Sequence, residues 1–170
     1  LDSRMHDWLT RHAVVDDYAV VRMPRQLLAL EPADVRLAVL AWGLSVTGVG
    51  EPMERAAAEA IAQWLALGRE NRRTANGAVL SGRRHVIEFM REPGRIRERM
   101  TCVGETGRLI FDGRFEVVAP PGAQVGPMGV KPSLKRPKDV PGLAFSSLPL
   151  VKMADGRLIC PVRSADPAIS

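Results

Sequence analysis

The spacing of apolar residues changes near Gly68, and this change limits the possible folds more than any other feature of the sequence. Before Gly68, apolar residues recur at the spacing of one face of an amphipathic helix. After Gly68 they fall into short runs separated by turn residues, which is typical of strands joined by hairpins. The sequence therefore predicts an α+β fold, in which a small helical subdomain at 1–68 precedes a small β-rich module at 69–170.

Two helices are expected in the first part, at 32–46 and 52–67. A proline begins each segment, where its missing N–H costs nothing, and Gly48 and Gly68 follow the two ends. Their apolar faces predict that the two helices pack together as an antiparallel pair. Shorter elements are expected before this pair: a helix at 2–12, a strand at 18–23 and a helical turn at 24–30.

Turn residues predict three β-hairpins in the second part. Asp112-Gly113 lies between two alternating runs and is a strong hairpin signal. Gly82-Arg83-Arg84 and Ala154-Asp155-Gly156 separate the other two pairs of runs. The strands are expected at 77–81 with 85–90, 108–111 with 114–118, and 148–153 with 157–161. A turn is expected at 93–100, and the proline- and glycine-rich stretch 120–142 predicts a long loop.

Charge is distributed unevenly along the chain. Residues 1–67 carry six arginines and nine acidic residues, a net charge of −3, whereas residues 68–170 carry eighteen basic and ten acidic residues, a net charge of +8. An acidic helical part followed by a basic part is the pattern expected of a module that binds a polyanion. Basic surfaces also serve solubility, so the charge alone leaves both interpretations open.

Patterns typical of catalytic and metal sites are missing from the sequence. The three histidines, at positions 6, 12 and 85, do not have the spacing of metal ligands, and neither GxGxxG nor GxxxxGK[ST] occurs. Cys102 and Cys160 form no CxxC pair; we expect buried free thiols, with a structural disulfide as the alternative. No apolar run is long enough for a transmembrane helix, so a membrane is not an expected partner.

Arginine dominates the stretch 69–99 and supplies the candidate binding residues. Nine arginines occur in these 31 residues against four glutamates, and the first lysine of the chain is Lys131. A planar guanidinium donates two parallel hydrogen bonds to a phosphate, so arginine suits an RNA backbone. The alternative is a solvated surface with Arg–Glu pairs, such as Glu92 with Arg95. The candidate RNA-binding residues are Arg69, Arg72, Arg73, Arg83, Arg84, Arg95, Arg97 and Arg99.

Longer motifs follow one another over most of the chain. They are Met23–Leu30, Val35–Trp42 leading into Thr47-Gly48, Glu51–Ala57, Leu65–Gly68, Thr74–Gly82, Glu88–Arg95, Phe111–Phe115, Ser147–Pro149 and Asp155–Leu158. In this order they resemble the region that follows the catalytic domain in bacterial tRNA(Ile)-lysidine synthetases, most closely those of the alphaproteobacterial kind. The motifs are diffuse patterns, so their shared order carries the resemblance.

The resemblance implies a part of a ligase that joins lysine to the wobble cytidine of the isoleucine tRNA with a CAU anticodon. That family uses ATP and Mg²⁺ and forms an adenylated cytidine. Its ATP-binding loop, Ser-Gly-Gly-x-Asp-Ser, is absent here, so no catalytic residue of the family can be placed on this sequence. Residues 1–17 would then correspond to the end of the linker helix that leaves the catalytic domain.

The function implied is therefore non-catalytic and cytoplasmic: this portion would position the tRNA for the enzyme's own N-terminal catalytic domain. ATP and Mg²⁺ would belong to the parent enzyme, and this portion would hold no cofactor. The alternative is a protein-interaction or dimerisation module without RNA binding, with a homodimer as the expected assembly. The alanine-rich segment 56–62 and the segment 100–103 are the surfaces that this alternative would use.

Overall fold

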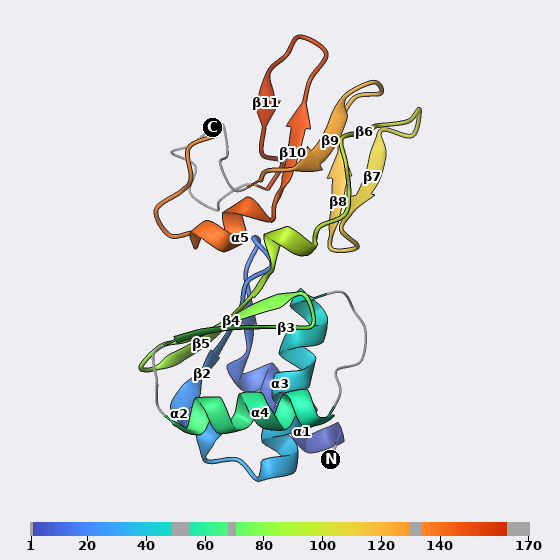
Figure 1. Cartoon of the computed structure of the whole chain (residues 1–170). Helices are drawn as coiled ribbons and strands as arrows, with labels where there is room; N and C mark the ends of the chain where they lie inside the picture. Colours follow the sequence, from blue (N-terminus) through green and yellow to red (C-terminus); the bar gives the residue numbers. More distant parts are fainter. Residues whose placement is uncertain (1, 49–54, 68–70, 130–133, 163–170) are drawn as a thin grey trace. The chain divides into compact units, whose positions relative to one another are not determined.

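The computed structural model describes residues 2–48, 55–67, 71–129 and 134–162 of the chain (Figure 1). It has an α+β fold with its longer helices in the N-terminal part, as the apolar spacing predicts. The chain divides into two compact units, Leu1–Glu92 and Pro93–Ser170. The boundary expected after Gly68 falls inside the first unit, because the hairpin that follows Gly68 joins a sheet of that unit.

Within the described residues, the first unit combines four helices with a five-stranded antiparallel sheet of order β1-β2-β5-β4-β3. The helices are α1 (Asp2–His12), α2 (Arg25–Ala29), α3 (Ala33–Thr47) and α4 (Arg55–Ala66). The strands are β1 (Val14–Val15), β2 (Val21–Pro24), β3 (Asn71–Ala75), β4 (Ala78–Gly82) and β5 (Val86–Arg91). The expected elements at 2–12, 24–30 and 32–46 are thus confirmed, and so are the described part of the helix at 52–67 and the hairpin around Gly82-Arg83-Arg84.

Pairing between β2 and β5 explains why the hairpin belongs to the first unit. Val21 pairs with Phe89 and Met23 with Ile87, and all four side chains are buried. Apolar residues of α3 and α4 pack in the same core, on the helical side of the sheet (Figure 1). A helical subdomain that ended at Gly68 would leave these β2 side chains without their partners, so the sheet sets the boundary.

Helices α3 and α4 contact each other, but Figure 1 shows α4 crossing α3 rather than running antiparallel to it. Val39 and Leu44 of α3 enter the same core as Ile61 and Trp64 of α4. Both helices therefore cover the sheet as well as each other. The expected antiparallel pair is wrong in orientation because the apolar face of a helix does not reveal which surface it will cover.

The turn between β3 and β4 consists of Asn76 and Gly77, with φ angles of 51° and 70°. Two central residues with positive φ are the requirement of a tight type I′ hairpin, whose twist matches that of the strands. The C-terminal end of α3 lies close to this turn: a Cβ on Gly48 would come within 2.2 Å of the carbonyl oxygen of Asn76. The turn therefore docks against the helix as well as joining two strands.

The second unit is built mainly from strands. Its elements are the 3₁₀ turn η1 (Pro93–Arg95), β6 (Thr101–Cys102), β7 (Arg108–Phe111), β8 (Phe115–Val118), β9 (Gln124–Pro127), α5 (Gly142–Ser146), β10 (Pro149–Lys152) and β11 (Leu158–Ile159). They form a four-stranded sheet of order β11-β10-β9-β6 and the separate hairpin β7-β8. Both hairpins predicted in this part are confirmed.

The stretch 120–142 differs from the expected loop. Strand β9 lies within it and pairs with both β10 and β6, and Val125 of β9 is buried beside Val151 of β10 in the core of this unit. The segment 130–133 lies outside the described residues. The sequence did not predict β9 because Val125 is the only large apolar residue in this four-residue strand, which also contains a glycine and a proline.

Candidate nucleic-acid interface

Four of the candidate arginines gather at one end of the first unit's sheet. Strand register places Asn71 opposite Gly82, so Arg72 and Arg73 begin β3 beside the β4–β5 turn. That turn carries Arg83 and Arg84. Because β3 is an edge strand, Arg72 and Arg73 are both exposed although they alternate between the two faces of the sheet. The structure therefore collects residues that are ten or more positions apart in the sequence.

Glu88 is the only acidic residue on strands β2 to β5, and it is already engaged. Its buried carboxylate accepts a hydrogen bond from Nε of Arg22 at 3.2 Å and from Nε of Arg83 at 3.0 Å. Arg22 also donates to Asp16 at 2.5 Å. Burial alone would lower the pKa of Arg22. The hydrogen bonds and charges of Asp16 and Glu88 outweigh burial and raise the pKa above its usual value, so the guanidinium stays charged. Two guanidiniums and two carboxylates thus neutralise one another, and Arg83 is partly a structural residue.

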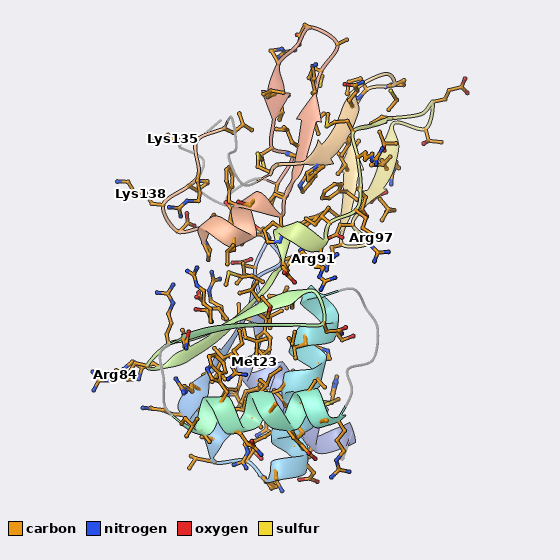
Figure 2. The ribbon with its side chains drawn as sticks, viewed as in Figure 1. Met23, Arg84, Arg91, Arg97, Lys135 and Lys138 are labelled. Atoms are coloured by element: carbon orange, nitrogen blue, oxygen red, sulfur yellow. The ribbon has the colours of Figure 1, made fainter. Side chains whose placement is uncertain are left out.

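Arg72, Arg73 and Arg84 differ from Arg83 in this respect. All three are exposed, and their guanidiniums meet no acceptor among the described residues. Arg84 projects from the end of the β4–β5 hairpin, away from the sheet (Figure 2). We call these three residues the sheet-end arginines. Among the described residues no carboxylate pairs with them, because the neighbouring Glu88 already binds Arg22 and Arg83.

Arg25, which was not among the candidates, holds the turn that carries Arg83 and Arg84. Its backbone N–H donates to the carbonyl of His85 at 2.9 Å, and its Nη1 donates to the carbonyl of Arg83 at 3.1 Å. The side chain is buried, and Nη2 also reaches the carbonyl of Leu65 at 2.5 Å. Sequence reasoning missed this residue because it lies far from the arginine-rich stretch and acts through backbone carbonyls.

The remaining candidates belong to the second unit or lie outside the described residues. Arg95 ends η1, and Arg97 (Figure 2) and Arg99 follow it in a segment without helix or strand; all three are exposed. Two lysines that were not candidates, Lys135 and Lys138, are also exposed, in the segment before α5. Arg69 lies outside the described residues.

Charge divides differently once the observed boundary is used. Residues 1–92 carry twelve arginines and twelve acidic residues, a net charge of zero, whereas residues 93–170 carry twelve basic and seven acidic residues, a net charge of +5. The first unit is therefore neutral as a whole, so any basic surface in it is local. The second unit is basic as a whole.

The two cysteines are free thiols, but the expectation that both are buried is wrong for Cys102. Cys102 lies on the short strand β6 and is exposed. Cys160 is partly buried, and this burial raises the pKa of its thiol. Neither belongs to a metal site: among the described residues, no group of three or more His, Cys, Asp or Glu side chains could hold an ion.

No helix in the described part of the chain has the length and apolar character needed to cross a membrane. No protein family, no curated protein and no solved structure matches the chain.

Proposed function

We propose that this chain binds the phosphate backbone of RNA and positions a tRNA without performing chemistry itself. The observation that supports this most is the set of sheet-end arginines, Arg72, Arg73 and Arg84, which are exposed at one end of a single sheet and pair with no carboxylate of the described residues. Guanidinium groups bind phosphate through paired, charge-assisted hydrogen bonds. The second unit offers its own exposed arginines at 95, 97 and 99.

The resemblance to tRNA(Ile)-lysidine synthetases gives the proposal its substrate. The RNA would be the isoleucine tRNA with a CAU anticodon, and the partner would be the N-terminal catalytic domain of the same cytoplasmic enzyme. A-form RNA is recognised mainly through its shape and backbone, so exposed arginines without a base-reading pocket suit this task. Holding the tRNA in one orientation would lower the entropic cost of bringing the cytidine to the reaction.

Chemistry on the cytidine would remain with the catalytic domain. In the family, ATP activates the base and Mg²⁺ assists, and the Ser-Gly-Gly-x-Asp-Ser loop that would hold ATP is absent from this sequence. The described residues of this chain would contribute binding and orientation only. Binding of tRNA to this chain should therefore need neither ATP nor Mg²⁺, and it should weaken when the sheet-end arginines are removed.

The test is binding of the chain to the CAU-anticodon isoleucine tRNA, measured by fluorescence anisotropy over a salt series. For about five phosphate contacts, the affinity should fall by two to three orders of magnitude between about 50 and 200 mM salt. An elongator methionine tRNA with the same anticodon separates tRNA positioning from general RNA binding. Tighter binding of the isoleucine tRNA supports positioning; equal affinities reduce the function to phosphate binding alone.

Self-association is the second candidate function, and one surface favours it. On the outer side of the β7–β8 hairpin, Ile110 and Val118 are 64% and 66% exposed. The segments expected to serve this function are less suitable: Ala58 and Ile61 of α4 pack in the core, and Val103 is buried. A mass that rises with concentration, and that returns to the monomer value on Ile110→Lys, would support this candidate.

A further inference from the structure

A cavity of about 240 Å³ lies in the first unit between α2, α3 and α4. Its apolar wall includes the buried side chains of Leu28, Leu40 and Ile87. Arg25 and Arg36 also line it, and neither Asp nor Glu is among the described residues of the wall. Pockets for drug-sized ligands measure about 300–1,000 Å³, so this cavity has room for a smaller molecule.

The charges of the two arginines are not neutralised by any carboxylate among the described residues. Arg25 is only 8% exposed, and the acceptors of its guanidinium are the backbone carbonyls of Leu65 and Arg83. Arg36 donates to the carbonyl of Ala29 at 3.1 Å. A guanidinium has five N–H donors, so each arginine retains donors for a further acceptor.

A buried cation without a counter-charge is costly, and a bound anion would remove that cost. The apolar wall adds a second requirement, because a fully hydrated ion such as inorganic phosphate would gain nothing from Leu28, Leu40 and Ile87. A ligand that satisfies both requirements carries one carboxylate and a short hydrocarbon body. We propose that this cavity binds a small apolar monocarboxylate, with Arg25 and Arg36 at the carboxylate and the leucines around the hydrocarbon.

This site is independent of the proposed RNA binding, because the sheet-end arginines do not line the cavity. Arg25 nevertheless connects the cavity to the β4–β5 turn, since it lines the cavity and also donates a hydrogen bond to the carbonyl of Arg83. An occupied cavity should therefore be visible at the amide groups near Leu65 and in the β4–β5 turn. No such change is expected at the strands of the second unit.

The experiment is titration of the isotope-labelled full chain with hexanoate, followed by the chemical shifts of its backbone amides. Hexanamide, which has the same length but no charge, is the matched ligand. We expect saturable shifts in α2, α4 and the β4–β5 turn with hexanoate, and binding at least tenfold weaker with hexanamide, because charge-assisted hydrogen bonds are about twice as strong as neutral ones. Equal affinities for the two ligands, or no saturable shift at millimolar hexanoate, would overturn the proposal.

Two variants locate the site without removing the hydrogen bonds of Arg25 to the carbonyls of Arg83 and Leu65. Arg36→Gln removes one charge from a half-buried side chain, and Ala62→Leu fills part of the cavity from α4. Each should weaken hexanoate binding at least tenfold while leaving the amide spectrum of the folded chain in place. If hexanoate binds both variants as it binds the original chain, the ligand lies elsewhere and the proposed site is wrong. RNA binding should be retained in both variants, so failure of this proposal is distinguishable from failure of the proposed function.

Discussion

Arg83 donates a hydrogen bond from Nε to Oε2 of the buried Glu88 at 3.0 Å. Its neighbour Arg84 is exposed at the end of the same turn and meets no acceptor among the described residues. Two adjacent arginines therefore have different tasks, although nothing in the sequence separates them. This difference allows the contribution of charge to RNA binding to be measured within one turn.

Arg84→Ala should weaken RNA binding more than Arg83→Ala does. Loss of one phosphate contact should lower the affinity about three- to tenfold and reduce the salt slope by about 1 for Arg84→Ala. Arg83→Ala should change the slope less, because Glu88 already takes part of its donor capacity. Anisotropy titrations of both variants at several salt concentrations provide the comparison. Equal slopes for the two variants would contradict the distinction.

Glu88→Gln should destabilise the first unit. The carboxylate is buried and accepts from both Arg22 and Arg83, so the neutral amide leaves these guanidiniums with a poorer acceptor. Both arginines are partly exposed, which reduces the loss, and we expect about 1–3 kcal/mol in the free energy of unfolding by urea. Glu59→Gln on α4 is the control, since its pair with Arg55 is solvent-exposed and should contribute little to stability. A cost no larger than that of the control would show that the Glu88 pairs do not stabilise the fold.

Gly48→Ala should destabilise the first unit through a clash with backbone. The added Cβ would lie 2.2 Å from the carbonyl oxygen of Asn76 and 2.6 Å from that of Leu44. Backbone atoms cannot move aside as a flexible side chain does, so the cost should be about 3 kcal/mol, at the upper end for overpacking. Ser45→Ala on the same helix should be neutral or slightly stabilising. Thermal unfolding of the two variants makes the comparison, and a neutral Gly48→Ala would mean that α3 and the β3–β4 turn do not approach so closely.

Cys102 should react with a thiol reagent several-fold faster than Cys160 at neutral pH. Cys102 is exposed, whereas burial raises the pKa of Cys160 and so reduces the fraction of reactive thiolate at a given pH. The rate at Cys160 should continue to rise at higher pH, because a raised pKa means that more of its thiol becomes thiolate there. Peptide mapping after brief alkylation at several pH values distinguishes the two sites. Faster labelling of Cys160 at neutral pH would contradict its burial.

Much of the local structure could be predicted from the sequence. Pro32 and Gly48 bracket helix α3 to within a residue, and Asp112-Gly113 forms the predicted turn, with φ angles of 50° and 63°. These signals act through the backbone conformations that proline and glycine permit, so they require no knowledge of the rest of the fold. The predicted α+β class follows from the same kind of local information.

Strand β3 and the unit boundary were missed for a physical reason. Residues 71–75 are polar and largely exposed, so they show no alternating apolar pattern. The available signal was Asn76-Gly77, a strong two-residue hairpin sequence that pairs β3 with β4. Pairing between β2 and β5 joins residues more than sixty positions apart, and no local pattern encodes it.

The sequence predicts that arginines form the candidate site, but it identifies only some of the residues that belong to it. Arginine-rich composition identified Arg72, Arg73 and Arg84, which remain exposed, but could not show that Glu88 engages Arg83. It also missed Arg25, whose role depends on carbonyl groups that converge only in the folded chain. The partners of an arginine, whether carboxylates or backbone carbonyls, are known only from the three-dimensional structure. Only the structure therefore distinguishes arginines that could bind a ligand from those that hold the fold together.

The most direct test of RNA binding through the sheet-end arginines compares two triple variants over one salt series. Arg72, Arg73 and Arg84 are changed to alanine in the first, and Arg4, Arg11 and Arg55 in the second. The control arginines are also exposed but lie beside acidic partners on or near helices. The account predicts that the first variant loses about 3 from the salt slope and at least tenfold in affinity, while the second matches the original chain. Equal losses in both variants would show that overall charge, and not this surface, attracts RNA.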